Sequence, residues 1–150
     1  MSSIPFLITK GRKIMQHVFL VGAKSLGAYG GYETFVYKLT EYHQNNKNIK
    51  YHVACKANGN GCMDETKLDR VKRINYFEFE FHNARCFKIQ VPDIGAAQAI
   101  YYDVKSLDYC CRYIKEHHIE NPIVYIMACR IGPFMKHYYK AIHNLGGKVY

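Results

Sequence analysis

The sequence predicts an α/β fold: a parallel sheet flanked by helices, with a β-hairpin inserted into it or placed at its edge. Continuous apolar runs at 17–23 and 121–129 have the composition of strands buried on both faces. Segments with apolar residues at helical spacing separate and follow these runs. Strands that alternate with helices favour a parallel sheet joined by right-handed crossovers. We therefore expect the runs at 17–23, 50–57 and 123–128 to be neighbouring or near-neighbouring strands.

In the first half of the chain, "HVFLVGA" (17–23) ends with glycine and predicts a buried strand. Apolar residues then recur at helical spacing until "NNKN" interrupts them. "KYHVACKA" has the character of a second strand, and a long polar stretch follows it. The expected elements are a helix over about 31–44, a strand at 50–57 and a polar loop at 58–73.

In the second half, two alternating runs meet around "HNAR" and predict an antiparallel hairpin with one hydrated face, over 75–91. A helical stripe of apolar residues follows from Ala96 to His118. "NPIVYIMAC" predicts another buried strand, and "RIGPF" leads into a helix with Pro133 in its first turn. "GGKVY" ends that helix and begins a further strand.

Composition limits the possible classes of protein. The 150 residues, 49% of them hydrophobic, suffice for one domain with a substantial core. In the leader 1–14, basic residues follow the apolar patch, which is the reverse of a secretory signal, so we expect the fold to occupy 15–150. No apolar run approaches the roughly 20 residues of a membrane span. Six cysteines without metal-site spacing indicate reduced thiols of a cytoplasmic protein, and no metal is expected.

The charge is strongly basic, with 21 Lys and Arg residues against 12 Asp and Glu residues. This excess predicts attraction to phosphates of nucleic acid, anionic lipid or a nucleotide. The cations are scattered, with one denser stretch, "KLDRVKR" (67–73). A solvated basic surface without a specific partner is the alternative interpretation.

The glycine-rich segment "GAYGGYETF" (27–35) is the first candidate site. It lacks the GxGxxG pattern of dinucleotide-binding proteins, and "GAKSLG" lacks the Lys and Ser/Thr that complete a P-loop. Gly30 and Gly31 nevertheless precede a helix, where free backbone N–H groups favour an anion such as a diphosphate. The alternative is a tight turn in which Glu33 caps the helix. The second candidate segment is 129–133, where Arg130 is the expected anion contact.

Two segments carry a resemblance to a known family. "VFLVGAKSLGAYGGYETFVYKLTEY" and "YIMACRIGPF" resemble the N-terminal domain of bacterial rhamnosyltransferase-like enzymes, within the retaining GT-B glycosyltransferases of family 4. The likeness extends from about Met15 to Tyr150. It implies a Rossmann-like domain that forms the N-terminal, acceptor-side half of a GT-B fold. From the resemblance we expect the C-terminal donor domain of such enzymes to be absent from these residues.

The resemblance also implies roles for individual residues. Gly30 and Gly31 match the glycine loop that approaches the donor diphosphate, with Tyr29 and Glu33 beside them. A second loop that faces the cleft is matched by Cys129, Arg130 and Gly132. The family loop has a proline that this chain lacks, and "MACRIG" stands where many relatives have a histidine. No catalytic base is therefore assigned, since the departing phosphate can accept the proton of the acceptor.

The implied function is sugar transfer from a nucleotide-sugar to a lipid-linked or glycan acceptor, in cell-surface polysaccharide synthesis. We expect no cofactor beyond the nucleotide-sugar substrate, and a cytoplasmic location that includes the inner, anionic face of the membrane. Residues 1–150 alone should be inactive. One alternative is a non-catalytic α/β module that binds a nucleotide or phosphate. A basic nucleic-acid-binding domain is the other, but no RNP, KH or helix-turn-helix pattern supports it.

Overall fold

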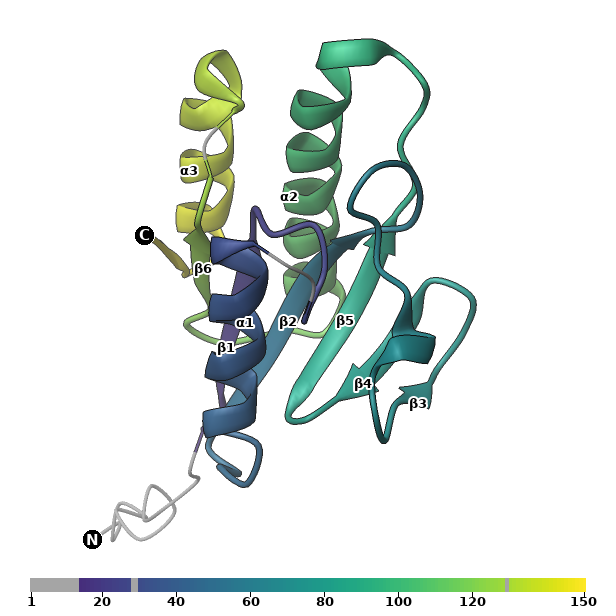
Figure 1. The fold of residues 1–150 in the computed structure, drawn as a ribbon. Helices are drawn as coiled ribbons and strands as arrows, with labels where there is room; N and C mark the ends of the chain where they lie inside the picture. The colour runs from purple at the N-terminus through teal and green to yellow at the C-terminus, as the bar shows by residue number, and fades with distance from the viewer. Residues whose placement is uncertain (1–13, 28–29, 129) are drawn as a thin grey trace, which may run out of the picture.

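The computed structural model describes residues 14–27, 30–128 and 130–150, so all but the last residue of the expected leader lies outside it. It contains a single sheet with helices on both faces (Figure 1). The strands are β1 (Gln16–Val21), β2 (Ile49–Lys56), β3 (Lys72–Arg73), β4 (Glu78–Phe81), β5 (Ala84–Ile89), β6 (Ile123–Ile126) and β7 (Lys148–Val149). The helices are α1 (Gly31–Tyr42), α2 (Gln98–Glu116) and α3 (Met135–Asn144).

The sheet has the order β3-β4-β5-β2-β1-β6-β7. The predicted neighbours are confirmed, because β1 lies between β2 and β6 and is parallel to both. The predicted hairpin is present as β4 and β5. Its second arm is not an insertion, however, because β5 pairs in parallel with β2, with Val53 opposite Cys86. Only β3 and β4 form an antiparallel edge.

Two hydrophobic layers hold the sheet between the helices. Along β1 the side chains alternate: Phe19 and Val21 pack with α2 and α3, whereas Leu20 packs on the α1 side. The α2–α3 layer includes Tyr102 and Leu107, and the α1 layer is centred on Val36. In Figure 1, α2 and α3 cover one face of the sheet and α1 crosses the other. Burial on both faces explains why the central strands are continuous apolar runs.

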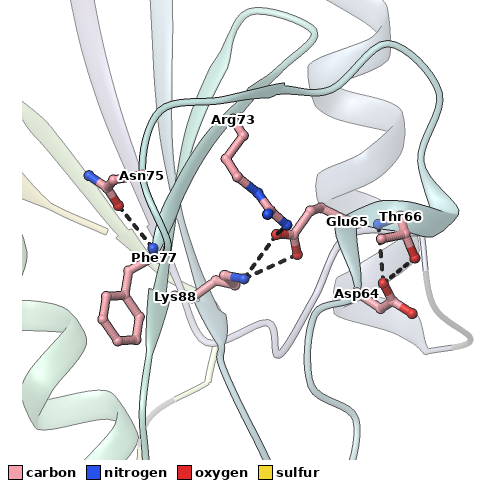
Figure 2. Close-up of polar contacts among 7 residues, drawn as sticks. All are labelled: Asp64, Glu65, Thr66, Arg73, Asn75, Phe77 and Lys88. Atoms are coloured by element: carbon pink, nitrogen blue, oxygen red, sulfur yellow. Dashed lines mark hydrogen bonds and ion pairs between the residues drawn. The ribbon is translucent and has the colours of Figure 1, made fainter.

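The predicted polar loop is tied to the sheet edge by a buried carboxylate. Glu65 is 7% exposed and accepts hydrogen bonds from Arg73, at 2.8 Å, and from Lys88, at 3.0 and 3.1 Å (Figure 2). Burial opposes ionisation of Glu65, but hydrogen bonds from the backbone, Lys88 and Arg73 outweigh it and lower its pKa. Asp64 caps the short 3₁₀ turn, accepting from the backbone N–H of Thr66 at 3.1 Å. The loop therefore has a fixed path between β2 and β3.

No helix in the described part of the chain is long and apolar enough to cross a bilayer.

Candidate functional site

Four parallel strands, β1, β2, β5 and β6, end at the same edge of the sheet. The loops that follow them surround a pocket of about 230 Å³. In an open α/β sheet, this carboxyl edge is where ligands bind. The side chains that matter most in its lining are Lys24, Lys56, Asn60, Gln98, Tyr102 and Arg130.

The two segments that carry the family resemblance, 18–42 and 125–134, meet at this edge. Gly22 follows β1 with φ of 123°, and a Cβ there would stand 2.7 Å from the backbone nitrogen of Ala128. Only glycine permits that approach, because the neighbouring atom is backbone and the conformation is left-handed. The N–H of Met127 also donates to the carbonyl of Val21 at 2.8 Å. The loops after β1 and β6 are thus in direct contact.

The glycine pair lies at the start of α1, as predicted. Gly30 is the N-cap and Gly31 the first helical residue. Glu33 folds back over Gly30, since a Cβ on Gly30 would stand 2.2 Å from its Oε2. Its Oε1 accepts from the backbone N–H of Lys24 at 3.0 Å. Glu33 therefore ties the start of α1 to the loop after β1, in place of a capping box closed on its own N-cap.

Gly31 offers open backbone at the helix start, because no atom lies within 4 Å of the position of a Cβ. Gly132 is equally open and begins the 3₁₀ turn Gly132–Phe134 that precedes α3. The two other residues assigned by resemblance, Tyr29 and Cys129, lie outside the described residues.

Arg130 lines the pocket, but its guanidinium is already hydrogen-bonded to Asp103 and to the Gly22 carbonyl. Its Nε donates to Asp103 Oδ2 at 2.9 Å and an Nη to Oδ1 at 3.2 Å, with a further contact to the Gly22 carbonyl at 3.4 Å. The Asp103 side chain is 2% exposed. Burial raises its pKa, although the hydrogen bonds and charge of Arg130 oppose this. The charge of Arg130, the predicted anion contact, is thus compensated by Asp103. The sequence did not reveal this partner, because Asp103 lies on the helix whose apolar stripe hides it.

Lys56, the last residue of β2, is the site residue that sequence reasoning did not assign. It is 7% exposed, and its ammonium donates to the Asn60 carbonyl at 3.1 Å. Burial lowers its pKa, the positive charges of Lys24 and Arg130 lower it further, and Cys62 acts in the opposite direction. A signal was present in the sequence, because a lysine that ends an apolar run is placed at the carboxyl edge of the sheet.

A larger groove, of about 660 Å³, lies between α1 and the loop at 67–70. Charges of both signs line it, with Glu41 and Asp69 against Lys67 and Arg70. Arg130 lines the smaller carboxyl-edge pocket and not this groove, so the smaller pocket is the better candidate. Across the described ranges, no three His, Cys, Asp or Glu side chains are arranged to hold a metal ion.

Comparison with known proteins gives one match. The model of a family described as a domain of unknown function, DUF1972, matches residues 15–150. No curated protein and no solved structure matches the chain.

Proposed function

The chain belongs to the DUF1972 family over residues 15–150, and we propose that it is the acceptor-side domain of a glycosyltransferase. In this proposal a sugar passes from a nucleotide-sugar to a lipid-linked or glycan acceptor, in cell-surface polysaccharide synthesis. A second domain holds most of the donor across a cleft. The resemblance to rhamnosyltransferase-like GT-B enzymes supplies this reaction class.

One observation carries the proposal: the two segments that bear the resemblance come together at the ligand-binding edge of the sheet. They cover 18–42 and 125–134, yet Gly22 and Ala128 meet so closely that no side chain fits between them. Arg130 extends from the second segment to the carbonyl of Gly22 in the first. The parallel pairing of β1 with β6 brings both segments to the edge where α/β folds bind ligands, and this position supports the proposal.

The chemistry needs few protein groups on this side of the cleft. The acceptor oxygen bonds to the anomeric carbon of the donor sugar while the bond from that carbon to the diphosphate oxygen breaks. The departing diphosphate accepts the proton of the acceptor hydroxyl. The open backbone at Gly31 gives the diphosphate access to the helix start, where N–H groups and the helix dipole favour negative charge.

A membrane-bound acceptor agrees with the surface of the 67–77 region. Lys67, Arg70 and Lys72 are exposed there. They lie in sequence next to three exposed apolar side chains, Ile74, Tyr76 and Phe77. Cations combined with aromatic and aliphatic groups suit an anionic lipid–water interface.

The test compares binding of both substrates with transfer. A short-chain prenyl diphosphate-linked sugar should bind residues 1–150 more tightly than any of a panel of nucleotide-sugars, measured by calorimetry. No labelled sugar should be transferred by this domain alone. Tight nucleotide-sugar binding without acceptor binding would contradict the acceptor-side assignment, and robust turnover by these 150 residues would contradict the two-domain arrangement.

A non-catalytic module that binds a nucleotide or phosphate is the second candidate. It is favoured by the pocket lining, which offers cations and amides and, among the described residues, no carboxylate. The same calorimetry separates the two candidates, because such a module binds free nucleotides or phosphates and gains nothing from an acceptor sugar.

A further inference from the structure

We propose that Lys24 and Lys56, together with the N-terminus of α2, form a phosphate-binding site that holds a phosphate of the acceptor. The identity of the acceptor rests on the proposed function, whereas phosphate binding does not. Neither Gly30 nor Gly31 lines this pocket, so the site is separate from the glycine loop that approaches the donor.

The first argument is the unpaired charge of Lys56. All 12 Asp and Glu residues lie in the part of the chain that the structure describes, and within that part none lies at ion-pair distance from Lys56. Lys56 is nonetheless only 7% exposed. Burying a cation without a counter-charge is unfavourable, and an anion bound beside it offsets that cost.

The loop after β2 holds the Lys56 ammonium in place. Gly59 and Gly61 have φ of 81° and 75°, so the loop can fold back over the strand end. The Lys56 carbonyl accepts from Met63 N–H at 2.8 Å, while its ammonium donates to Asn60. The side-chain amide of Asn58 fastens the same loop to Val91, donating at 2.9 Å and accepting at 2.8 Å. The ammonium is therefore pre-positioned, with donors left for a ligand.

The second argument is the helix start that faces the same pocket. Gln98 and Ala99, the first residues of the 19-residue helix α2, line it after the turn Gly95–Ala97. The N-cap Ala97 provides no side-chain cap, and the first turn of this fully described helix has no acidic residue. The N–H of Gln98 already donates to the Gly95 carbonyl, so the N–H groups of the turn Gly95–Ala97 and the positive dipole end of α2 are what is available to an anion.

The balance of charge identifies the ligand class. Asp103 compensates Arg130 through two hydrogen bonds, leaving Lys24 and Lys56 as the uncompensated charges of the pocket. Two ammonium groups match a phosphate that carries up to two negative charges. Arg130 is then a positioning residue, which connects α2 to the carbonyl of Gly22 and fixes the pocket wall.

The experiment measures thermal unfolding and calorimetric binding with three probes: inorganic pyrophosphate, a short-chain prenyl diphosphate-linked sugar, and phosphatidylglycerol vesicles. The variants are Lys56→Met, Lys24→Met and, as control, the exposed Lys115→Met. Pyrophosphate should raise the melting temperature of the wild type. Lys56→Met should weaken pyrophosphate and sugar-linked diphosphate binding roughly 10- to 100-fold, the loss expected for a charge-assisted hydrogen bond. Lys24→Met should weaken both as well, whereas Lys115→Met should not.

A folding defect is separated from a binding defect by the ligand-free protein. Without phosphate, Lys56→Met should melt at or above the wild-type temperature, because the substitution removes an unpaired buried charge. Unchanged pyrophosphate affinity in both Lys56→Met and Lys24→Met would overturn the proposal. So would a wild-type response no larger than that to sulfate at matched ionic strength.

The probes separate the two proposals and the two sources of phosphate. Binding of pyrophosphate through Lys56 without binding of the sugar-linked diphosphate would support the phosphate site and contradict the glycosyltransferase assignment. Vesicle binding that depends on Lys56 would overturn the acceptor assignment in favour of a lipid headgroup. Loss of both soluble probes in Lys56→Met, with vesicle binding kept, is the expected result.

Discussion

The guanidinium of Arg130 and the carboxylate of Asp103 form a two-pronged ion pair, at 2.9 and 3.2 Å, in the wall of the carboxyl-edge pocket. The pair joins the loop after β6 to α2, and Asp103 is almost fully buried. A guanidinium with fixed fork geometry matches a carboxylate in this way, which a lysine cannot reproduce. Arg130 therefore holds the pocket wall in place, and its charge is already balanced by Asp103 before any ligand binds.

Arg130→Met should lower the free energy of unfolding by about 1–3 kcal/mol, because Asp103 is left buried without its partner. The pKa of Asp103 is already raised by burial, and losing Arg130 raises it further. A carboxyl group whose pKa is raised on folding stabilises the protonated folded state, so the loss should shrink as the pH falls toward about 4. Urea unfolding at about pH 4.5 and pH 7.5 measures it. If Arg130→Met lowers the free energy of unfolding equally at both pH values, the unpaired Asp103 carboxylate is not the cause.

The glycines of the two loops should respond differently to alanine. Gly31→Ala places its methyl group in open space and should change the stability by less than about 0.5 kcal/mol. Gly22→Ala should lower it by roughly 1–3 kcal/mol, because its Cβ meets the Ala128 backbone in a left-handed conformation. Thermal unfolding compares the two variants.

The functional consequence of Gly31→Ala needs an active enzyme that contains both domains. There the variant should keep its melting temperature yet lose donor binding or turnover, since the methyl group blocks the helix start. Unchanged kinetics in Gly31→Ala would mean that the glycine pair serves only the turn.

Much of the fold could be predicted from the sequence because its central strands are buried on both faces. The runs around Phe19 and Val124 have no polar interruption, and such runs are typical of central parallel strands. The hairpin was harder to place. Phe79 and Ile89 alternate with polar neighbours as in a strand with one hydrated face, and only pairing with β2 makes β5 part of the parallel sheet. Pairing partners are long-range information that local periodicity does not contain.

The carboxyl edge of the sheet could be predicted from the sequence, but the lining of its pocket could not: Arg130 lines the pocket, whereas Gly30 and Gly31 do not. Glycines in the sequence marked the loops that follow β1 and β6. In the structure these two loops come into contact at Gly22. The partner of Arg130 could not be identified, because Asp103 lies 27 residues earlier, on a helix whose apolar stripe conceals it. Lys56 was overlooked for a related reason: its burial results from the fold of the loop at 58–61, which the polar composition of that loop does not reveal.

The buried His52, paired with the half-buried His17, should make stability depend on pH. His52 is 1% exposed, and its Nε2 lies 2.8 Å from Nδ1 of His17. Burial, with His17, Lys50, Arg85 and His117 adding to it, lowers the pKa of His52 to about 2. Below about pH 6.5 the His52 side chain is protonated in the unfolded state but stays neutral in the folded state. The free energy of unfolding therefore falls by up to about 1.4 kcal/mol per pH unit as the pH decreases.

The matched variant is His52→Phe, since the His52 ring is stacked on Phe19 at 4.3 Å between centroids and a benzene ring preserves that contact. Urea unfolding between about pH 5 and pH 7.5 should give a shallower slope for the variant than for the wild type. Equal slopes would show that other groups cause the pH dependence.

Binding to anionic membranes should involve the exposed cations of the 67–73 region. Partition onto phosphatidylglycerol vesicles should fall as salt rises, because charges are screened beyond about 10 Å at 0.1 M. Reversing Lys67, Arg70 and Lys72 to glutamate should weaken it further, measured by cosedimentation. Arg73 is left unchanged because it pairs with Glu65.

The control for this experiment reverses Lys115, Lys136 and Lys140, three exposed lysines on α2 and α3, which alters the net charge equally. Equal loss in both triple variants would mean that only net charge matters. Equal binding to neutral vesicles, or tighter binding to single-stranded RNA, would contradict a membrane role for this surface.

The most direct test of the account is a residue-by-residue NMR titration of the ¹⁵N-labelled chain with a short-chain prenyl diphosphate-linked sugar. If this is the acceptor-side domain, the amide shifts should change at the carboxyl edge of the sheet, in the loops at 22–27, 57–61, 95–99 and 130–132. The pocket at the opposite edge, beside His17 and His117, should remain unchanged. Shift changes confined to that opposite edge, or none at saturating ligand, would contradict the assignment.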